Sequence, residues 1–300
     1  MLLAIEIPYT MGYNNPSTNA GKMSTHGYDI DLGWQDHIGD FKYSLTVNFS
    51  DYLSKIDYLN GADIIGGGKI MRAGVYFNEY YGYICEGIYQ SQEEVNNSAV
   101  TSSSVTVGDL KYRDFSGPDG QPDGVISPEY DRVPLGNSLP RYQYGGQLNA
   151  AWKGFDLSLA FQGVGRQNAY LSAAIVQPLR DNYGNIPAII EGKYWSVFNT
   201  DEENARAQYP RLSNTSKSNN YATSSFWMFG GHYFRLKNVT LGYTLPTVLT
   251  KAIGIDRTRF YVSASDLFCL SNYPEGWDPE MGTSSYPITT SLIVGVQVNF

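Results

Sequence analysis

The chain has 300 residues and a formal net charge of -8; 42% of its residues are hydrophobic, but only 17% are charged. Its 21 basic residues are scattered, which argues against nucleic acid as a partner, because phosphate binding requires clustered Lys and Arg. No apolar run approaches the roughly 20 residues that a membrane-spanning helix requires, so transmembrane helices are excluded.

Alternation of apolar and polar residues predicts amphipathic β-strands along most of the chain. In chain order these are segments 26–36, 41–52, 141–153, 155–164, 233–245, 258–269 and 292–300, with two weaker ones at 68–76 and 80–90. In the last segment, one face carries Leu292, Val294, Val296, Val298 and Phe300. We therefore expect an antiparallel, all-β fold with about nine strands.

Very short and very long connections alternate between these strands. The turns Gly39-Asp40 and Lys153-Gly154 contrast with the long segments 91–140, 165–232 and 271–290. Outer-membrane barrels show this asymmetry, because their periplasmic turns are short and their outer loops are long. Aromatic residues near strand ends, where interfacial girdles would lie, favour the same fold: Trp34, Tyr142, Tyr144, Trp152 and Phe300. Between two of the strands, Thr247 to Gly254 predicts a short helical turn.

Other folds and functions share parts of this pattern. A soluble β-sandwich or lipocalin-like barrel also alternates, but it would have tight turns at both ends of its strands. A passive porin or adhesin that is complete in itself would need an even strand set and a signal peptide, which residues 1–6 do not provide. A soluble secreted glycan-binding or glycan-cleaving β-domain would show paired catalytic carboxylates. We therefore expect a piece of a longer outer-membrane protein.

Segments spread in order over nearly the whole chain resemble the SusC/RagA family of TonB-dependent transporters. They comprise residues 19–28, 81–92, 131–137, 153–163, 261–268 and 276–280. The most specific stretch is Phe234-Arg235-Leu236-Lys237-Asn238-Val239-Thr240-Leu241-Gly242-Tyr243-Thr244-Leu245-Pro246.

The resemblance implies that residues 1–300 are the carboxy-terminal portion of a transmembrane β-barrel of about 22 strands, without its signal peptide and plug domain. It implies import of oligosaccharide or peptide nutrients across the outer membrane of a Gram-negative bacterium, without enzymatic activity. The expected partners are a SusD-like surface lipoprotein, TonB through the missing amino-terminal part, outer-membrane lipid and the substrate.

Segment 114–131 contains a candidate calcium loop, and members of the family often carry an acidic turn of this kind here. Positions 1, 3, 5, 7 and 9 of an EF-hand-like loop are filled by Asp119, Gln121, Asp123, Val125 and Ser127. Position 12 should be a bidentate acid but is Tyr130, with Asp131 one residue out of register. The alternative is a solvated turn stabilised by side-chain-to-backbone hydrogen bonds, and the sequence leaves both open.

No motif in the chain reads as catalytic. The three histidines are far apart, and the Gly66-Gly67-Gly68 run lacks the Lys and Ser or Thr of a phosphate loop. Cys85 and Cys269 have no metal-binding or redox spacing, so we expect packed thiols rather than a disulfide. In the long outer loop, candidate substrate or lid contacts are Tyr194, Trp195 and Trp227, whose rings suit either sugar stacking or folding of the loop onto itself.

Overall fold

The computed structural model describes residues 2–4, 10, 12, 17–61, 63–172, 176–179, 184, 186–214, 217–252, 254–282, 285–286 and 288–300. The chain divides into two compact units. We call residues 26–53, 140–167 and 230–300 the sheet unit, and residues 1–25, 54–139 and 168–229 the loop unit. Each unit is therefore built from three stretches that lie far apart in the sequence.

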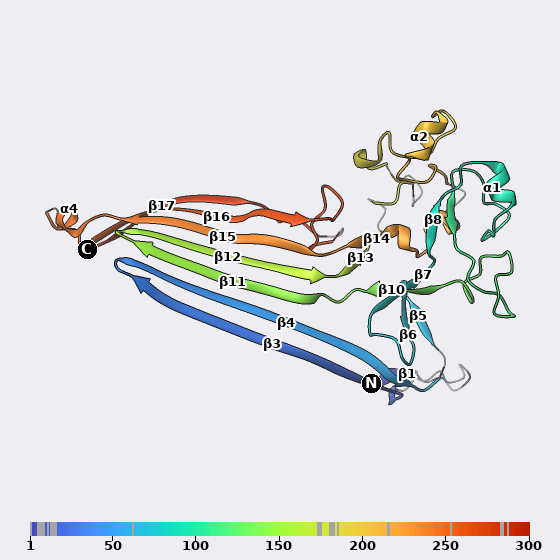
Figure 1. The fold of residues 1–300 in the computed structure, drawn as a ribbon, viewed down its shortest axis with the longest axis horizontal. Coiled ribbons are helices and arrows are strands. Elements are labelled where there is room, and N and C mark those ends of the chain that lie inside the picture. Colours follow the sequence, from blue (N-terminus) through green and yellow to red (C-terminus); the bar gives the residue numbers. More distant parts are fainter. Residues whose placement is uncertain are drawn as a thin grey trace. The chain divides into compact units, whose positions relative to one another are not determined.

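Seven long antiparallel strands form one continuous sheet (Figure 1). They are β3 (Gly21–Ile38), β4 (Phe41–Leu59), β11 (Arg141–Trp152), β12 (Phe155–Arg166), β15 (Tyr233–Thr244), β16 (Arg257–Ser271) and β17 (Ser291–Asn299). The order across the sheet is β17-β16-β15-β12-β11-β4-β3, so each strand lies beside the next long strand of the sequence. The antiparallel, all-β fold expected from the sequence is confirmed.

Tight turns join β3 to β4 and β11 to β12. Lys153 and Gly154 both have positive φ, +47° and +89°, as a type I′ hairpin requires. This turn type matches the right-handed twist of the strands that it connects. Figure 1 shows both turns, helix α4 (Thr247–Lys251) and the carboxyl end at the same end of the sheet. The helical turn expected over residues 247–254 is present over Thr247–Lys251, and residue 253 lies outside the described residues.

The strand register places side chains of like polarity on the same face. Leu148 of β11 lies opposite Leu45 of β4 and Leu159 of β12. At the next position of β11, Asn149 lies opposite Ser44 of β4 and Ser158 of β12, and all three residues are polar. Because the side-chain period of a strand is two, this register makes one face of the sheet apolar and the other polar, as the sequence predicts.

The apolar face is exposed over much of its area. Leu32 of β3 is 66% exposed, and Leu292 and Val294 of β17 are 71% and 75% exposed. Contiguous apolar surface of this kind marks contact with lipid or with another protein.

Aromatic rings lie toward both ends of this apolar face. Tyr28, Phe49 and Tyr142 stack on three neighbouring strands near one end, and Phe155 packs on Tyr243 near the other. Along β4, Phe41 and Phe49 are eight residues apart, which corresponds to about 27 Å at about 3.4 Å per residue. That height is close to the apolar band of about 25 Å in outer-membrane barrels.

The number of long strands differs from the expectation. The weaker strands expected at 68–76 and 80–90 do not join the long sheet, so the described residues supply seven long strands rather than about nine. This stretch instead forms the short β5 (Ile64–Gly66), β6 (Lys69–Met71), β7 (Glu79–Gly82) and β8 (Cys85–Ile88). Gly67, Gly68 and Gly74 have positive φ, which bends the chain after only a few residues.

The loop unit is made of short elements. Four strands pair in the order β10-β7-β6-β5, with β10 at Val133–Asn137. Three further two-stranded pairs are β1 (Leu2–Ala4) with β2 (Ser17–Asn19), β8 with β9 (Leu110–Tyr112), and β13 (Asn168–Tyr170) with β14 (Met228–Gly230). Its helices are α1 (Gln92–Asn96), α2 (Asp201–Ala205) and α3 (Lys217–Asn220), with 3-10 turns at Ala188–Ile190 and Ser225–Trp227. None of the described helices is long and apolar enough to cross a bilayer.

Candidate functional site

The polar face of the sheet unit carries a hollow of about 690 Å³ over β4, β11 and β12. Its lining side chains include the amides and hydroxyls of Thr46, Asn48, Gln143, Gln147, Gln162 and Tyr233. The residues that line it, all within described strands, carry no formal charge. Amide side chains both donate and accept hydrogen bonds, so this surface suits neutral ligands rich in hydroxyl or amide groups.

The strand register brings these amides together. Gly145 of β11 lies between Asn48 of β4 and Gln162 of β12. A Cβ atom at Gly145 would stand 3.0 Å from Asn48 Oδ1, so the glycine leaves room for the amide. The hollow is therefore a direct result of the polar positions of the alternating pattern.

Five charged residues gather at one end of the same face, and we call them the Arg235 cluster: Arg235, Lys237, Asp266, Asp278 and Glu280. Arg235 of β15 is only 3% exposed, with Nη2 2.6 Å from Asp278 Oδ2 and Nε 2.5 Å from Glu280 Oε1. Lys237 Nζ lies 2.7 Å from Asp266 Oδ1. Three carboxylates thus surround two cations.

The Arg235 cluster touches the edge of the hollow. Gln162 Nε2 donates to Glu280 Oε2 at 3.0 Å and lies 3.4 Å from the hydroxyl oxygen of Tyr233. Gln162 and Tyr233 both line the hollow. The cluster and the hollow are therefore parts of one site.

Irregularities in the sheet orient the side chains of the Arg235 cluster. The register between β15 and β16 shifts between Leu236 and Asn238, and Asp266 on the facing strand has φ +50°. A bulge reorients side chains locally and is common next to functional sites. Arg235 and Lys237, on either side of Leu236, both approach Asp266 Oδ1, at 3.9 Å from Nη1 and 2.7 Å from Nζ respectively.

An Arg–Asp pair marks the opposite end of the polar face. Arg259 of β16 binds Asp156 of β12 through two nitrogens, at 2.9 and 2.5 Å. Asp156 also lines a second hollow of about 570 Å³, together with Asp36 and Lys42. Charge therefore lies at both ends of the polar face, with the uncharged hollow of about 690 Å³ between them.

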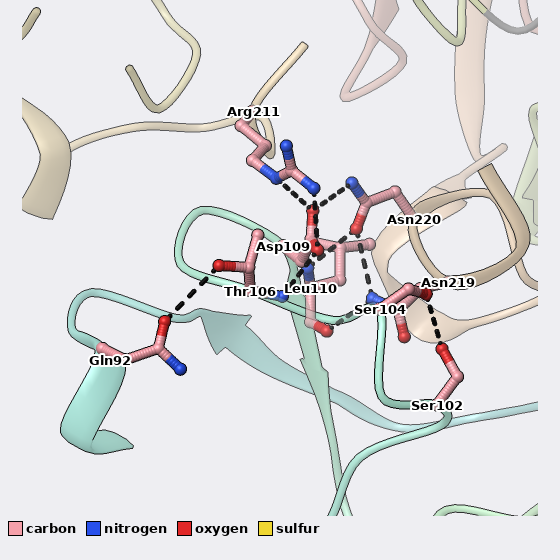
Figure 2. Close-up of polar contacts among 9 residues, drawn as sticks. All are labelled: Gln92, Ser102, Ser104, Thr106, Asp109, Leu110, Arg211, Asn219 and Asn220. Atoms are coloured by element: carbon pink, nitrogen blue, oxygen red, sulfur yellow. Dashed lines mark hydrogen bonds and ion pairs between the residues drawn. The ribbon is translucent and has the colours of Figure 1, made fainter. Parts of the chain in front are cut away.

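A buried polar hub joins distant stretches of the loop unit (Figure 2). The carboxylate of Asp109 is fully buried and accepts hydrogen bonds from Arg211 Nε at 2.7 Å and Asn220 Nδ2 at 2.9 Å. Asn219 donates to the carbonyl of Leu110 at 2.9 Å. Because these residues come from segments about a hundred positions apart, the hub holds distant parts of the loop unit together.

The three aromatic loop candidates lie in different environments within the loop unit. Trp227 is fully buried, and its indole nitrogen donates to the carbonyl of Asn220 at 2.8 Å. Trp195 is 7% exposed. Tyr194 is half-buried, and its backbone forms an isolated β-bridge with that of Tyr209. Burial makes the two tryptophans part of the loop's own packing, and a substrate contact by Tyr194 stays a prediction.

The carboxylates of the candidate calcium loop hold their own backbone. Both oxygens of buried Asp131 accept backbone N–H groups, from Phe115 at 2.8 Å and from Ser127 at 2.7 Å. Asp123 accepts from Val125 at 3.0 Å, while Asp119 is exposed. In the described part of the chain, no three His, Cys, Asp or Glu side chains lie in a metal-binding group. These bonds account for the turn, and calcium binding stays a prediction.

Both cysteines are free thiols, as the sequence predicts. Burial raises the pKa of the Cys85 thiol to about 11, so this thiol is neutral at physiological pH. It packs against the hydrophobic cluster around Tyr83, Leu110 and Tyr112. Cys85 is therefore a packed residue rather than a reactive one.

The Arg235 cluster was not predicted as a site from the sequence. Its members lie in three of the segments that resemble the family, but the pairing of Arg235 with Asp278 joins residues 43 positions apart. Arg235 and Lys237, two charged residues near the start of β15, are the local signal that points to it.

Comparison with known proteins agrees with this architecture. No family model matches the chain. TonB-dependent receptor P3 of Formosa agariphila is 26% identical over 329 aligned residues, which cover 100% of this chain and 31% of that protein. A solved structure of the RagAB peptide transporter has a TM-score of 0.74 at 21% identity, covering 100% of this chain and 32% of that one. The RagAB peptide importer in its open-open state has a TM-score of 0.72 at 20% identity.

These coverages mean that the chain spans about a third of the length of the relatives that it matches, 31% to 32%. The two solved structures share its fold, and the curated relative aligns with it from end to end. Over its whole length the chain is thus similar in sequence to a TonB-dependent receptor, and it shares the fold of the RagAB structures, in agreement with the segments that resemble SusC/RagA proteins.

Proposed function

We propose that this chain supplies barrel wall and outer loops to a TonB-dependent importer of oligosaccharide or peptide nutrients in the outer membrane of a Gram-negative bacterium. The observation that carries the proposal is the two-faced sheet, whose exposed apolar face suits lipid and whose polar face bears an uncharged hollow of about 690 Å³. In a membrane barrel, residues alternate between lipid and lumen in this manner.

The hollow supports a neutral, hydrogen-bonding substrate. Its amides, including Gln143 and Gln147, match the hydroxyls of a sugar chain and the backbone groups of a peptide equally well. The RagAB structures belong to a peptide transporter, which makes a peptide a natural first probe.

Two protein partners belong to the proposal. A SusD-like surface lipoprotein would seat on the outer loops and deliver the substrate, and TonB would act through parts of the full-length protein outside residues 1–300. Support for both comes from the relatives, one a TonB-dependent receptor and one a two-protein RagAB assembly by its name. In this proposal the activity is transport, with no bond made or broken.

Uptake by cells that carry the full-length protein tests this function. A dye-labelled peptide mixture should accumulate, and a protonophore should abolish the accumulation because TonB requires the proton gradient of the inner membrane. The double variant Gln143→Leu, Gln147→Leu should lower uptake several-fold by removing amides from the hollow, at unchanged protein level. Leu148→Ile, on the opposite face of β11, is the matched control and should retain uptake. Uptake that survives the protonophore would instead indicate a passive porin.

A further inference from the structure

The segment that follows β16 folds into a turn that presents two carboxylates on one side. The amide of Trp277 donates to the carbonyl of Pro274 at 3.1 Å, and that of Gly282 to the carbonyl of Asp278 at 3.1 Å. Glu280 N also donates to Asp278 Oδ1 at 2.9 Å. These bonds order the turn, so the side chains of Asp278 and Glu280 both meet Arg235 on the polar face.

Two ion pairs join the turn to Arg235 of β15. Its guanidinium is 3% exposed, and the two loop carboxylates that it binds are 17% and 19% exposed. Breaking a buried ion pair by removing one partner is strongly unfavourable, because the remaining charges stay buried without compensation. The turn should therefore stay in contact with the polar face as long as Arg235 carries its charge.

We propose that Arg235 is a positioning residue that clamps segment 273–282 onto the polar face at the edge of the hollow. The hydrogen bond from Gln162 to Glu280 connects the turn to the hollow, because Gln162 lines the hollow and Glu280 belongs to the clamped turn. By holding Glu280 against Gln162, the clamp fixes the position of the turn beside the hollow, and this position limits the size of substrate that passes. This second step rests on the transport function proposed above.

Protease sensitivity of the purified full-length protein tests the clamp without reference to transport. Chymotrypsin cleaves after Trp277, a half-buried residue inside the turn. Cleavage of a segment that opens transiently follows the population of the open form. We expect Arg235→Met to raise the cleavage rate by about tenfold or more, because the loss of a buried ion-pair partner favours the open turn.

A near-isosteric variant and a matched control keep the test decisive. The double variant Asp278→Asn, Glu280→Gln removes the loop charges with little change in shape, and it should show the same faster cleavage even if Arg235→Met fails to fold. Arg259→Met breaks the Arg–Asp pair at the opposite end of the same face and should leave cleavage after Trp277 unchanged. A parental cleavage rate in the folded double variant would overturn the clamp.

Uptake of dye-labelled neutral peptides of graded length tests the second step. The double variant should accept longer peptides than the parent does, because the turn at the edge of the hollow is no longer fixed. A length preference identical to that of the parent, in a variant that is cleaved faster, would overturn the role in size selection. If the parent itself takes up no probe, the proposed function fails, while the cleavage experiment still decides whether the clamp exists.

Discussion

Leu159 and Ser158 are neighbours in β12 whose side chains lie on opposite faces of the sheet. Leu159 lies opposite Leu148 and Val239, whereas Ser158 lies opposite Asn149. We predict that Leu159→Lys costs about 2–4 kcal/mol of folding free energy near the bilayer midplane and that Ser158→Lys is nearly neutral. Folding of the full-length protein into lipid vesicles, followed by urea titration, measures both. Equal losses at the two positions would show that the faces are assigned wrongly.

Asp131 is expected to hold its turn whether or not a cation binds nearby. Its two oxygens accept backbone N–H groups, so Asp131→Asn replaces one acceptor by a donor that faces another donor. A buried polar group left unsatisfied costs about 1–3 kcal/mol, and limited proteolysis within 114–131 should speed up accordingly.

The same proteolysis experiment decides the calcium question. A bound cation would depend on Asp119 and Asp123, so chelation should loosen segment 114–131 in the parent, and calcium should restore its protection. The Asp123→Ala variant should then be sensitive with or without the chelator. Identical digestion of parent and variant under all conditions would establish an ordinary turn.

At the scale of elements, long strands could be predicted from the sequence and short ones could not. The expected strands 141–153 and 155–164 match β11 and β12 to within two residues, because a period of two is unmistakable over a dozen positions. Strand β6 has three residues, which is too few to show a period. Its place in the four-stranded order β10-β7-β6-β5 depends on contacts with distant segments.

One part of the candidate site could be predicted from the sequence, and the other could not. The polar face that bears the hollow follows from alternation alone, so its residues were predictable once the faces were assigned. The Arg235 cluster was not predictable, because it depends on a bulge in the β15–β16 pairing and on a turn after β16 that carries Asp278 and Glu280 to the strand. Neither feature has a local sequence signature that fixes the pairing partner.

At the scale of the whole molecule, the two edges of the long sheet lead to the last prediction. Among the described residues, β17 and β3 are the edge strands, so each has one side whose backbone groups are not paired within this sheet. In hydrocarbon each unsatisfied backbone group costs several kcal/mol, so both edges need partner strands in a membrane. The relatives, of which this chain covers 31% to 32%, have ample further sequence to supply such strands.

We therefore predict that residues 1–300 expressed alone do not insert as a stable unit and instead aggregate through their edges, whereas the full-length protein inserts. Heat-modifiable migration in detergent gels and protease protection in vesicles measure insertion for both. Charged substitutions on the exposed edges, such as Val294→Lys in β17, should reduce the aggregation of the isolated chain without enabling its insertion, because a charge on the apolar face is unfavourable in lipid. A compact, protease-protected and heat-modifiable form of residues 1–300 alone would contradict the prediction, since it would mean that the two edges are satisfied within this chain.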